Sequence, residues 1–118
     1  MPPSVMAEWV RCRQWIIPAL REETEAEVVG ELATGRAQIW GGRESALITQ
    51  LVTADEPLVH VWLGGGDMRE LMALQPGVEA WGRAQGAKAL WINGRKGWAR
   101  ALRRNGFEPM GDELRRAL

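Results

Sequence analysis

The chain has 118 residues, of which 46% are hydrophobic and 25% charged, a composition typical of one globular domain over 1–118 that excludes a disordered protein. No apolar run approaches the roughly 20 residues of a membrane helix, and charged residues near the start are not those of a signal peptide. One cysteine, Cys12, and one histidine, His60, exclude an internal disulfide and a Cys/His zinc site, so we expect no metal, no membrane association and residence in the cytoplasm.

The net charge of zero hides an asymmetry between the two halves of the chain. Residues 1–59 hold five basic and nine acidic side chains, whereas residues 60–118 hold ten basic and six acidic ones. An anionic ligand or an acidic partner is therefore expected to bind the C-terminal half.

Two helices are predicted at the start of the chain. Apolar residues at helical spacing indicate the first over 4–20, and Pro18 should end it because proline cannot donate to the helical ladder. The second begins at Thr24, where the hydroxyl and Glu27 three residues later form a capping box, and it ends at Gly35.

Three antiparallel strands are expected next, over 36–40, 45–52 and 58–63. The pair Gly41-Gly42 joins the first two strands in a tight hairpin, which needs the positive φ angles that glycine supplies. The third strand ends in three more glycines.

A crossover unit follows these glycines. A helix over 67–85, bent by Pro76, precedes a short apolar strand over 87–92, and a strand, helix, strand unit of this length is normally parallel. The remaining elements are a helix over 96–104 and a strand over 107–110. This order predicts an α+β fold in which a mixed, mostly antiparallel twisted sheet is flanked by helices.

Four short segments carry a resemblance to a known family. They are Gly64-Gly65-Gly66-Asp67, Trp81-Gly82-Arg83-Ala84-Gln85-Gly86, Gly94-Arg95-Lys96-Gly97-Trp98-Ala99-Arg100 and Arg104-Asn105-Gly106-Phe107. In their order and spacing the chain resembles the GNAT superfamily of acetyl-CoA-dependent N-acetyltransferases, and most of all small GNAT-like proteins encoded by bacteriophages and prophages. The resemblance implies a GNAT-like (acyl-CoA N-acyltransferase) fold and a location in the bacterial host cytoplasm or the phage particle.

The resemblance also implies a site for acetyl-CoA or CoA where the crossover helix begins, since backbone N–H groups there bind the diphosphate. The residues that would form it are Leu63, Gly64, Gly65, Gly66, Asp67, Met68 and Arg69. Asp67 and Arg69 replace two glycines of the family's pattern. Asp67 and Glu70 are spaced as a capping pair, so a carboxylate would occupy the N–H groups that a phosphate needs, although Arg69 supplies a cation. Alternatively, the glycines only form a tight turn and Asp67 only caps the helix.

The usual group for proton transfer is missing. Many family members have a tyrosine four residues before the glycine of the last motif, where this chain has Leu102, and the sequence contains no tyrosine. The candidate general base is His60, with Glu56 and Asp55 as alternatives. A histidine between two valines on a strand is also typical of a core or edge residue whose hydrogen bonds are satisfied. Because general acid–base help is typically worth about 10²–10⁴-fold, efficient catalysis is not expected.

A basic helix near the C-terminus is the candidate partner surface. Its residues are Arg95, Lys96, Trp98, Arg100, Arg103 and Arg104. It contains no acidic side chain, so it suits an acidic protein from phage or host or, as a second option, nucleic acid phosphates. A solvated helix face without a partner is the alternative.

Two functions follow from these observations. The first is a binding or assembly component with a GNAT-like fold, which uses the basic helix against another macromolecule. The second is an acetyl-CoA-dependent N-acetyltransferase that transfers an acetyl group to an amine. The missing tyrosine and the replaced glycines both favour the first.

Overall fold

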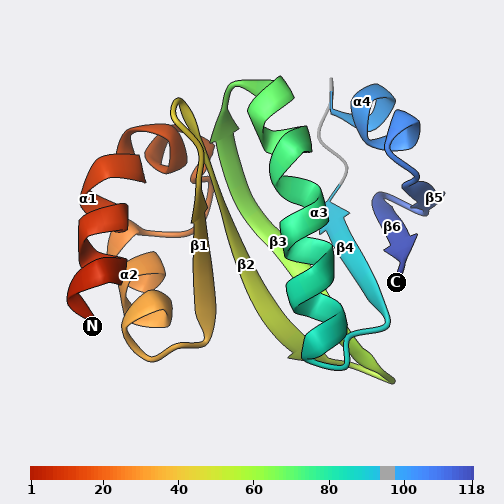
Figure 1. The fold of residues 1–118 in the computed structure, drawn as a ribbon, viewed down its shortest axis with the longest axis horizontal. Helices are drawn as coiled ribbons and strands as arrows, with labels where there is room; N and C mark the ends of the chain where they lie inside the picture. Colours follow the sequence, from red (N-terminus) through yellow and green to blue (C-terminus); the bar gives the residue numbers. More distant parts are fainter. Residues whose placement is uncertain (94–97) are drawn as a thin grey trace.

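A six-stranded mixed sheet with helices on both faces forms the protein in a computed structural model, which describes residues 1–93 and 98–118 (Figure 1). The strands lie in the order β1-β2-β3-β4-β6-β5. The elements are α1 (Pro3–Ile16), a 3-10 turn η1 (Ile17–Ala19), α2 (Glu25–Ala33), β1 (Ala37–Gly41), β2 (Ser45–Thr53), β3 (Pro57–Gly66), α3 (Met68–Ala84), β4 (Ala89–Asn93), α4 (Ala99–Arg104), β5 (Glu108–Met110) and β6 (Glu113–Ala117). The predicted α+β class, with a mixed sheet flanked by helices, is confirmed.

The two N-terminal helices form largely as predicted. α1 ends at Ile16, two residues before Pro18. The hydroxyl of Thr24 caps α2 by accepting a hydrogen bond from the Glu27 N–H at 3.2 Å, and Gly35 follows the helix with a φ of +77°. No bond from the Glu27 side chain back to Thr24 occurs in the described part of the chain, so only half of the expected capping box forms.

The prediction that Gly41 and Gly42 adopt positive φ angles is wrong. Gly41 is the last residue of β1, and neither glycine has a positive φ. The space at these glycines is occupied by side-chain ends, because a Cβ at Gly41 would lie 2.3 Å from the Arg11 guanidinium and one at Gly42 would lie 2.3 Å from a Glu70 carboxylate oxygen. Side chains from α1 and α3 therefore approach this hairpin closely, and they would have to move aside for a larger residue.

β3 is longer than predicted and includes the three glycines. Gly64 pairs with Leu47 and Gly66 pairs with Ser45, so the antiparallel ladder with β2 continues to the last residue of the strand. The glycines are strand residues, which corrects the expected strand end at Leu63.

A β-bulge at Trp62 changes the direction of the β3 side chains. Val61 pairs with Thr49 and Leu63 pairs with Ile48, which leaves Trp62 without a partner on β2. Val61 packs in the core beneath α3, whereas Leu63 packs against α1 and α2 on the opposite face. In a regular strand Val61 and Leu63, two residues apart, would point to one face, because strand residues alternate.

Each face of the sheet carries its own hydrophobic core. α3 and α4 cover one face, and α1 and α2 cover the other face over β1, β2 and β3 (Figure 1). The first core consists of Leu47, Val59, Val61, Leu71, Val78, Ala87, Leu90, Ile92, Leu102, Phe107 and Leu114. The second core consists of Trp9, Cys12, Ile16, Ala19, Val28, Leu32, Ala37, Ala46, Ile48 and Leu63.

The crossover through α3 joins two parallel strands, as predicted. Their ladder is short, since only Val59, His60 and Val61 of β3 pair with β4. β6 is a strand that the sequence pattern did not predict, and it lies between β4 and β5, antiparallel to both. None of the helices in the described residues is long and apolar enough to cross a bilayer.

Candidate functional site

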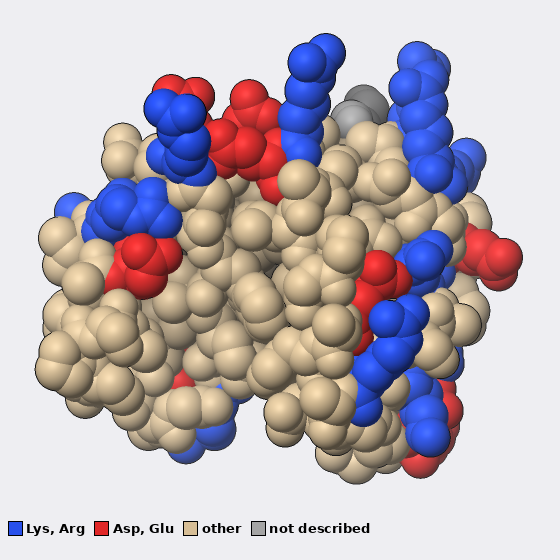
Figure 2. Space-filling model, in the orientation of Figure 1, with Lys and Arg blue, Asp and Glu red and all other residues tan. Residues whose placement is uncertain are grey.

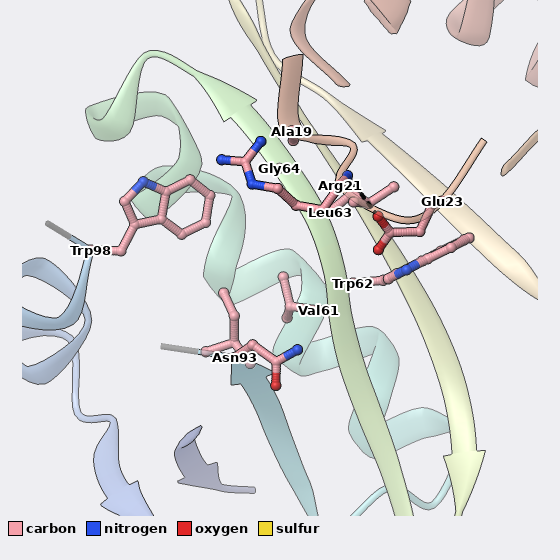
Figure 3. Close-up of a pocket in the computed structure, with 10 residues that line it drawn as sticks. Ala19, Arg21, Glu23, Val61, Trp62, Leu63, Gly64, Asn93 and Trp98 are labelled. Atoms are coloured by element: carbon pink, nitrogen blue, oxygen red, sulfur yellow. Dashed lines mark hydrogen bonds between the residues drawn. The ribbon is translucent and has the colours of Figure 1, made fainter. Parts of the chain in front are cut away.

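A pocket of about 270 Å³ opens where β3 and β4 part (Figure 3). The ladder between these strands ends at Val61 and Ile92, although β3 continues beside β2 to Gly66. Ala19, Val61, Leu63 and Ile92 form the aliphatic part of the lining. The aromatic and polar lining residues are Arg21, Glu23, Trp62, Asn93 and Trp98, from the α1–α2 connection, the two strands and the residue before α4.

Arg21 and Glu23 bring opposite charges to this pocket. The Glu23 carboxylate accepts a hydrogen bond from the Arg21 backbone N–H at 2.9 Å, and this bond, its own N–H and the Trp62 indole lower the pKa of Glu23. Glu23 is therefore ionised at neutral pH. The Arg21 guanidinium donates long bonds of 3.4 Å and 3.3 Å to the carbonyls of Pro18 and Leu20 and pairs with no carboxylate in the described part of the chain.

Leu63, Gly64 and Trp98 line the pocket and were predicted as site residues, whereas Arg21, Glu23 and Asn93 were not. The available signal is a charged connection between two helices and a polar residue that ends a short strand. Neither feature shows that the connection lies over β3, because that depends on how α1 packs on the sheet.

The glycines of β3 are explained by the close approach of other backbone segments. A Cβ at Gly65 would lie 2.1 Å from the Trp15 carbonyl oxygen, and a Cβ at Gly66 would lie 2.2 Å from the Glu44 carbonyl oxygen. Gly66 also has a φ of +99°, which favours glycine. The protein's own chain therefore requires these glycines, whether or not a ligand binds beside them.

The first turn of α3 is capped by the protein itself. The Asp67 carboxylate accepts hydrogen bonds from the N–H groups of Arg69 at 2.8 Å and Glu70 at 3.1 Å. The prediction that Glu70 completes a capping pair with Asp67 is wrong. The Glu70 carboxylate accepts from the Glu44 N–H at 2.9 Å and the Ser45 hydroxyl at 2.6 Å, while the Asp67 N–H donates to the Glu44 carbonyl.

These contacts show how poorly a CoA diphosphate fits this helix start. A phosphate needs the free N–H groups of the first turn, but a carboxylate of the same charge already accepts from two of them. Arg69 is exposed and does not line the pocket, and Met68 packs against the core beneath α3. The segment from Leu63 to Arg69 is continuous in space, but its residues do not fit a diphosphate as they stand.

His60 lies outside the pocket. Its ring stacks on that of Trp91 with centroids 4.2 Å apart, and Nδ1 lies 3.3 Å from Gln50 Oε1. Nε2 is buried without a hydrogen-bond partner in the described part of the chain, so the expectation of a fully satisfied histidine is wrong for this atom. Burial lowers the pKa of His60. The structure therefore does not bring His60 to the pocket between β3 and β4.

The burial of His60 predicts how stability depends on pH. Its folded pKa lies below the ordinary 6.5, so the unfolded chain binds the proton more readily, and stability should fall as the pH drops below that value. The variant His60→Gln has no such proton to bind. Urea unfolding near pH 8 and near pH 5 should show a larger loss of unfolding free energy in the wild type than in the variant. Equal losses would contradict the burial of this ring.

The other residues considered for proton transfer are also placed elsewhere. Glu56 forms an ion pair with Arg115 of β6, and Asp55 is exposed before β3. Leu102, at the position of the family's tyrosine, is buried in the core beneath α3. The three candidate bases, His60, Glu56 and Asp55, therefore do not line the pocket.

Three arginines of the predicted partner surface are exposed on α4. They are Arg100, Arg103 and Arg104. Figure 2 shows basic side chains projecting from the surface over this helix. Trp98 is only partly exposed on that surface, because it lines the pocket and packs against the core. Arg95 and Lys96 lie outside the described residues.

Comparison with protein-family models, with curated proteins and with solved structures finds no significant match to the chain. Within the described residues, no group of three or more His, Cys, Asp or Glu side chains is placed to hold a metal ion. The geometry of the pocket, of the α3 start and of α4 therefore carries the functional argument.

Proposed function

We propose that this chain is a GNAT-like protein of the bacteriophage type that works by binding or assembly rather than by acyl transfer. The GNAT-like part is supported by the order of elements and by the pocket where two parallel strands, joined through α3, part from each other. The non-catalytic part rests on one observation: the Asp67 carboxylate already accepts from the N–H groups that open α3.

Two further observations support the absence of acyl transfer. The position that corresponds to the family's tyrosine is a buried leucine, Leu102, which cannot donate a proton to a leaving thiolate. His60, the candidate base, stacks on Trp91 away from the pocket lining. In this proposal the pocket between β3 and β4 is present, but the residues around it do not supply a group for proton transfer.

The partner surface in this proposal is the exposed basic face of α4. Its arginines, Arg100, Arg103 and Arg104, form no ion pair in the described part of the chain, so their charges are available to a partner. An acidic protein of phage or host is the partner that we favour, and nucleic acid is the second option.

Calorimetric titration with acetyl-CoA and with CoA tests the proposal. We expect no specific heat for the wild type at ligand concentrations of about 1 mM, at the upper end of ordinary enzyme affinities. In Asp67→Ala the two N–H groups lose their acceptor and the repelling charge disappears. This variant should gain weak binding of both ligands, while losing about 1 kcal/mol of stability with its helix cap.

Asp55→Ala is the matched control, because it makes the same change in net charge at an exposed residue away from α3. It should bind neither ligand. Micromolar binding of acetyl-CoA by the wild type, abolished in Arg69→Ala, would overturn the proposal, since Arg69 would then compensate for the capped helix start.

The alternative function is an acetyl-CoA-dependent N-acetyltransferase acting on an amine. It is favoured by the separation of β3 and β4 beyond Val61 and Ile92, which leaves room for a ligand between two parallel strands. The same titration discriminates the two functions, because only the acetyltransferase requires the wild type to bind acetyl-CoA.

A further inference from the structure

Among the described residues that line the pocket between β3 and β4, Arg21 is the cation and Glu23 is the anion, and the charge of Arg21 contributes to the lowered pKa of Glu23. No ion pair links Arg21 to Glu23 in the described part of the chain, although only one residue separates them in sequence. In Figure 3 the Arg21 side chain extends toward Trp98, whereas the Glu23 carboxylate lies on the opposite side beside Trp62. A ligand that bears both charges would be held at two places at once.

The other described lining residues are mostly apolar or aromatic. Val61 and Ile92 line the pocket with aliphatic side chains, which we call its aliphatic floor. Figure 3 shows the indoles of Trp62 and Trp98 on opposite sides of Val61. Asn93 adds one neutral amide that both donates and accepts hydrogen bonds. A mostly apolar cavity with a few convergent polar groups is the usual form of a small-molecule site.

The size of the pocket limits its occupant. Its volume of about 270 Å³ lies just below the roughly 300–1,000 Å³ of pockets that hold drug-sized ligands. A single amino acid is smaller than such ligands, and its side chain could contact the aliphatic floor.

We propose that this pocket binds a small zwitterionic amino acid, with its carboxylate on Arg21, its ammonium group on Glu23 and its carbon chain against Val61 and Ile92. The Glu23 carboxylate is already fixed by the Arg21 backbone N–H and is ionised at neutral pH, so it is ready to accept from an ammonium group. The Arg21 guanidinium makes only long bonds to carbonyls, so a carboxylate offers it shorter, charge-assisted ones. This site needs neither CoA nor the α4 surface and stands apart from the proposed function.

Titration with L-leucine and with 6-aminohexanoate, in the absence of CoA, tests this inference. At least one of the two should bind specifically, and which one binds reports the spacing of the two charges. The analogues N-acetyl-L-leucine and L-leucinamide each lack one charge and also mimic the C-terminal and N-terminal residues of a peptide. Each should bind at least roughly tenfold more weakly than leucine, because one hydrogen-bonded charge pair is lost.

Variants assign the two charges to residues. Arg21→Gln and Glu23→Gln should each weaken binding at least roughly tenfold, whereas Arg21→Lys keeps the charge and should bind within a few-fold of the wild type. The matched controls are Glu22→Gln and Arg43→Gln, both at exposed residues that do not line the pocket. Their affinity should be unchanged.

Each of the following results would overturn the inference. They are no binding of either amino acid at millimolar concentration, equal affinity for leucine and both one-charge analogues, and equal loss in the Glu22 control. The thermal midpoint of every variant is measured to show that it is folded. If Arg21→Gln is unfolded, the comparison of Arg21→Lys with Glu23→Gln takes its place. Stronger binding of L-leucinamide than of leucine would show that Glu23 alone forms the site and would also contradict it.

Discussion

Replacing Gly66 with alanine should destabilise the protein by about 3 kcal/mol or more. Gly66 has a φ of +99°, and a Cβ there would lie 2.2 Å from the Glu44 carbonyl oxygen and 2.6 Å from the Ser45 Cα. Both neighbours are backbone atoms, of Ser45 at the start of β2 and of Glu44 just before it, so they cannot move aside as a flexible side chain would. Urea unfolding of Gly66→Ala against the wild type measures the loss.

Gly30→Ala is the matched control for this change. Gly30 lies in α2, has no positive φ, and a Cβ there would meet no atom within 4 Å. Alanine should therefore stabilise the protein by up to about 1 kcal/mol, because glycine is a poor helix former. A Gly66→Ala protein within about 0.5 kcal/mol of the wild type would show that the chain does not need this glycine.

A large loss at Gly66 would also change how its motif is interpreted. Three glycines before a helix suggest a phosphate site, but here a close backbone neighbour accounts for Gly65 and Gly66 without any ligand. The motif by itself would then be no evidence for a cofactor, and the function of the α3 start would depend on Asp67.

Most elements could be predicted from the sequence, because local signals fix them. Pro18 ends α1, Thr24 caps α2, and the crossover from β3 through α3 gives a parallel β4. The bulge at Trp62 and the extension of β3 through its glycines could not be predicted, since both depend on which residues of β2 lie opposite. β6 escaped prediction because its residues Glu113–Ala117 include two adjacent arginines and only one buried leucine.

The candidate site was predicted only in part. The capping role of Asp67 follows from a local pattern, and the structure confirms that its carboxylate occupies two N–H groups of α3. The pocket residues Arg21 and Glu23 precede Val61 of β3 by 40 and 38 residues in the sequence, and only the packing of α1 brings them there. A local pattern in the sequence cannot predict such a long-range contact.

Arg116→Met should destabilise the protein by about 3 kcal/mol, because it leaves a buried carboxylate without its cation. The Glu79 side chain on α3 is only 9% exposed and pairs with Arg116 of β6. Arg116 also donates to the Asn105 carbonyl after α4 at 3.0 Å, so one guanidinium ties β6 to two helices. Methionine keeps the apolar stem and removes the charge, and urea unfolding measures the effect.

Arg115→Met is the matched control, one residue earlier on the same strand. The carboxylate of its partner Glu56 is 39% exposed, so water can solvate it when the arginine is lost, and the cost should stay below about 1 kcal/mol. The double variant Glu79→Leu with Arg116→Met removes both charges and should regain much of the loss, because no buried charge remains unpaired. If the double variant is as unstable as Arg116→Met, the loss comes from the Asn105 contact, and the pair with Glu79 does not hold β6 in the sheet.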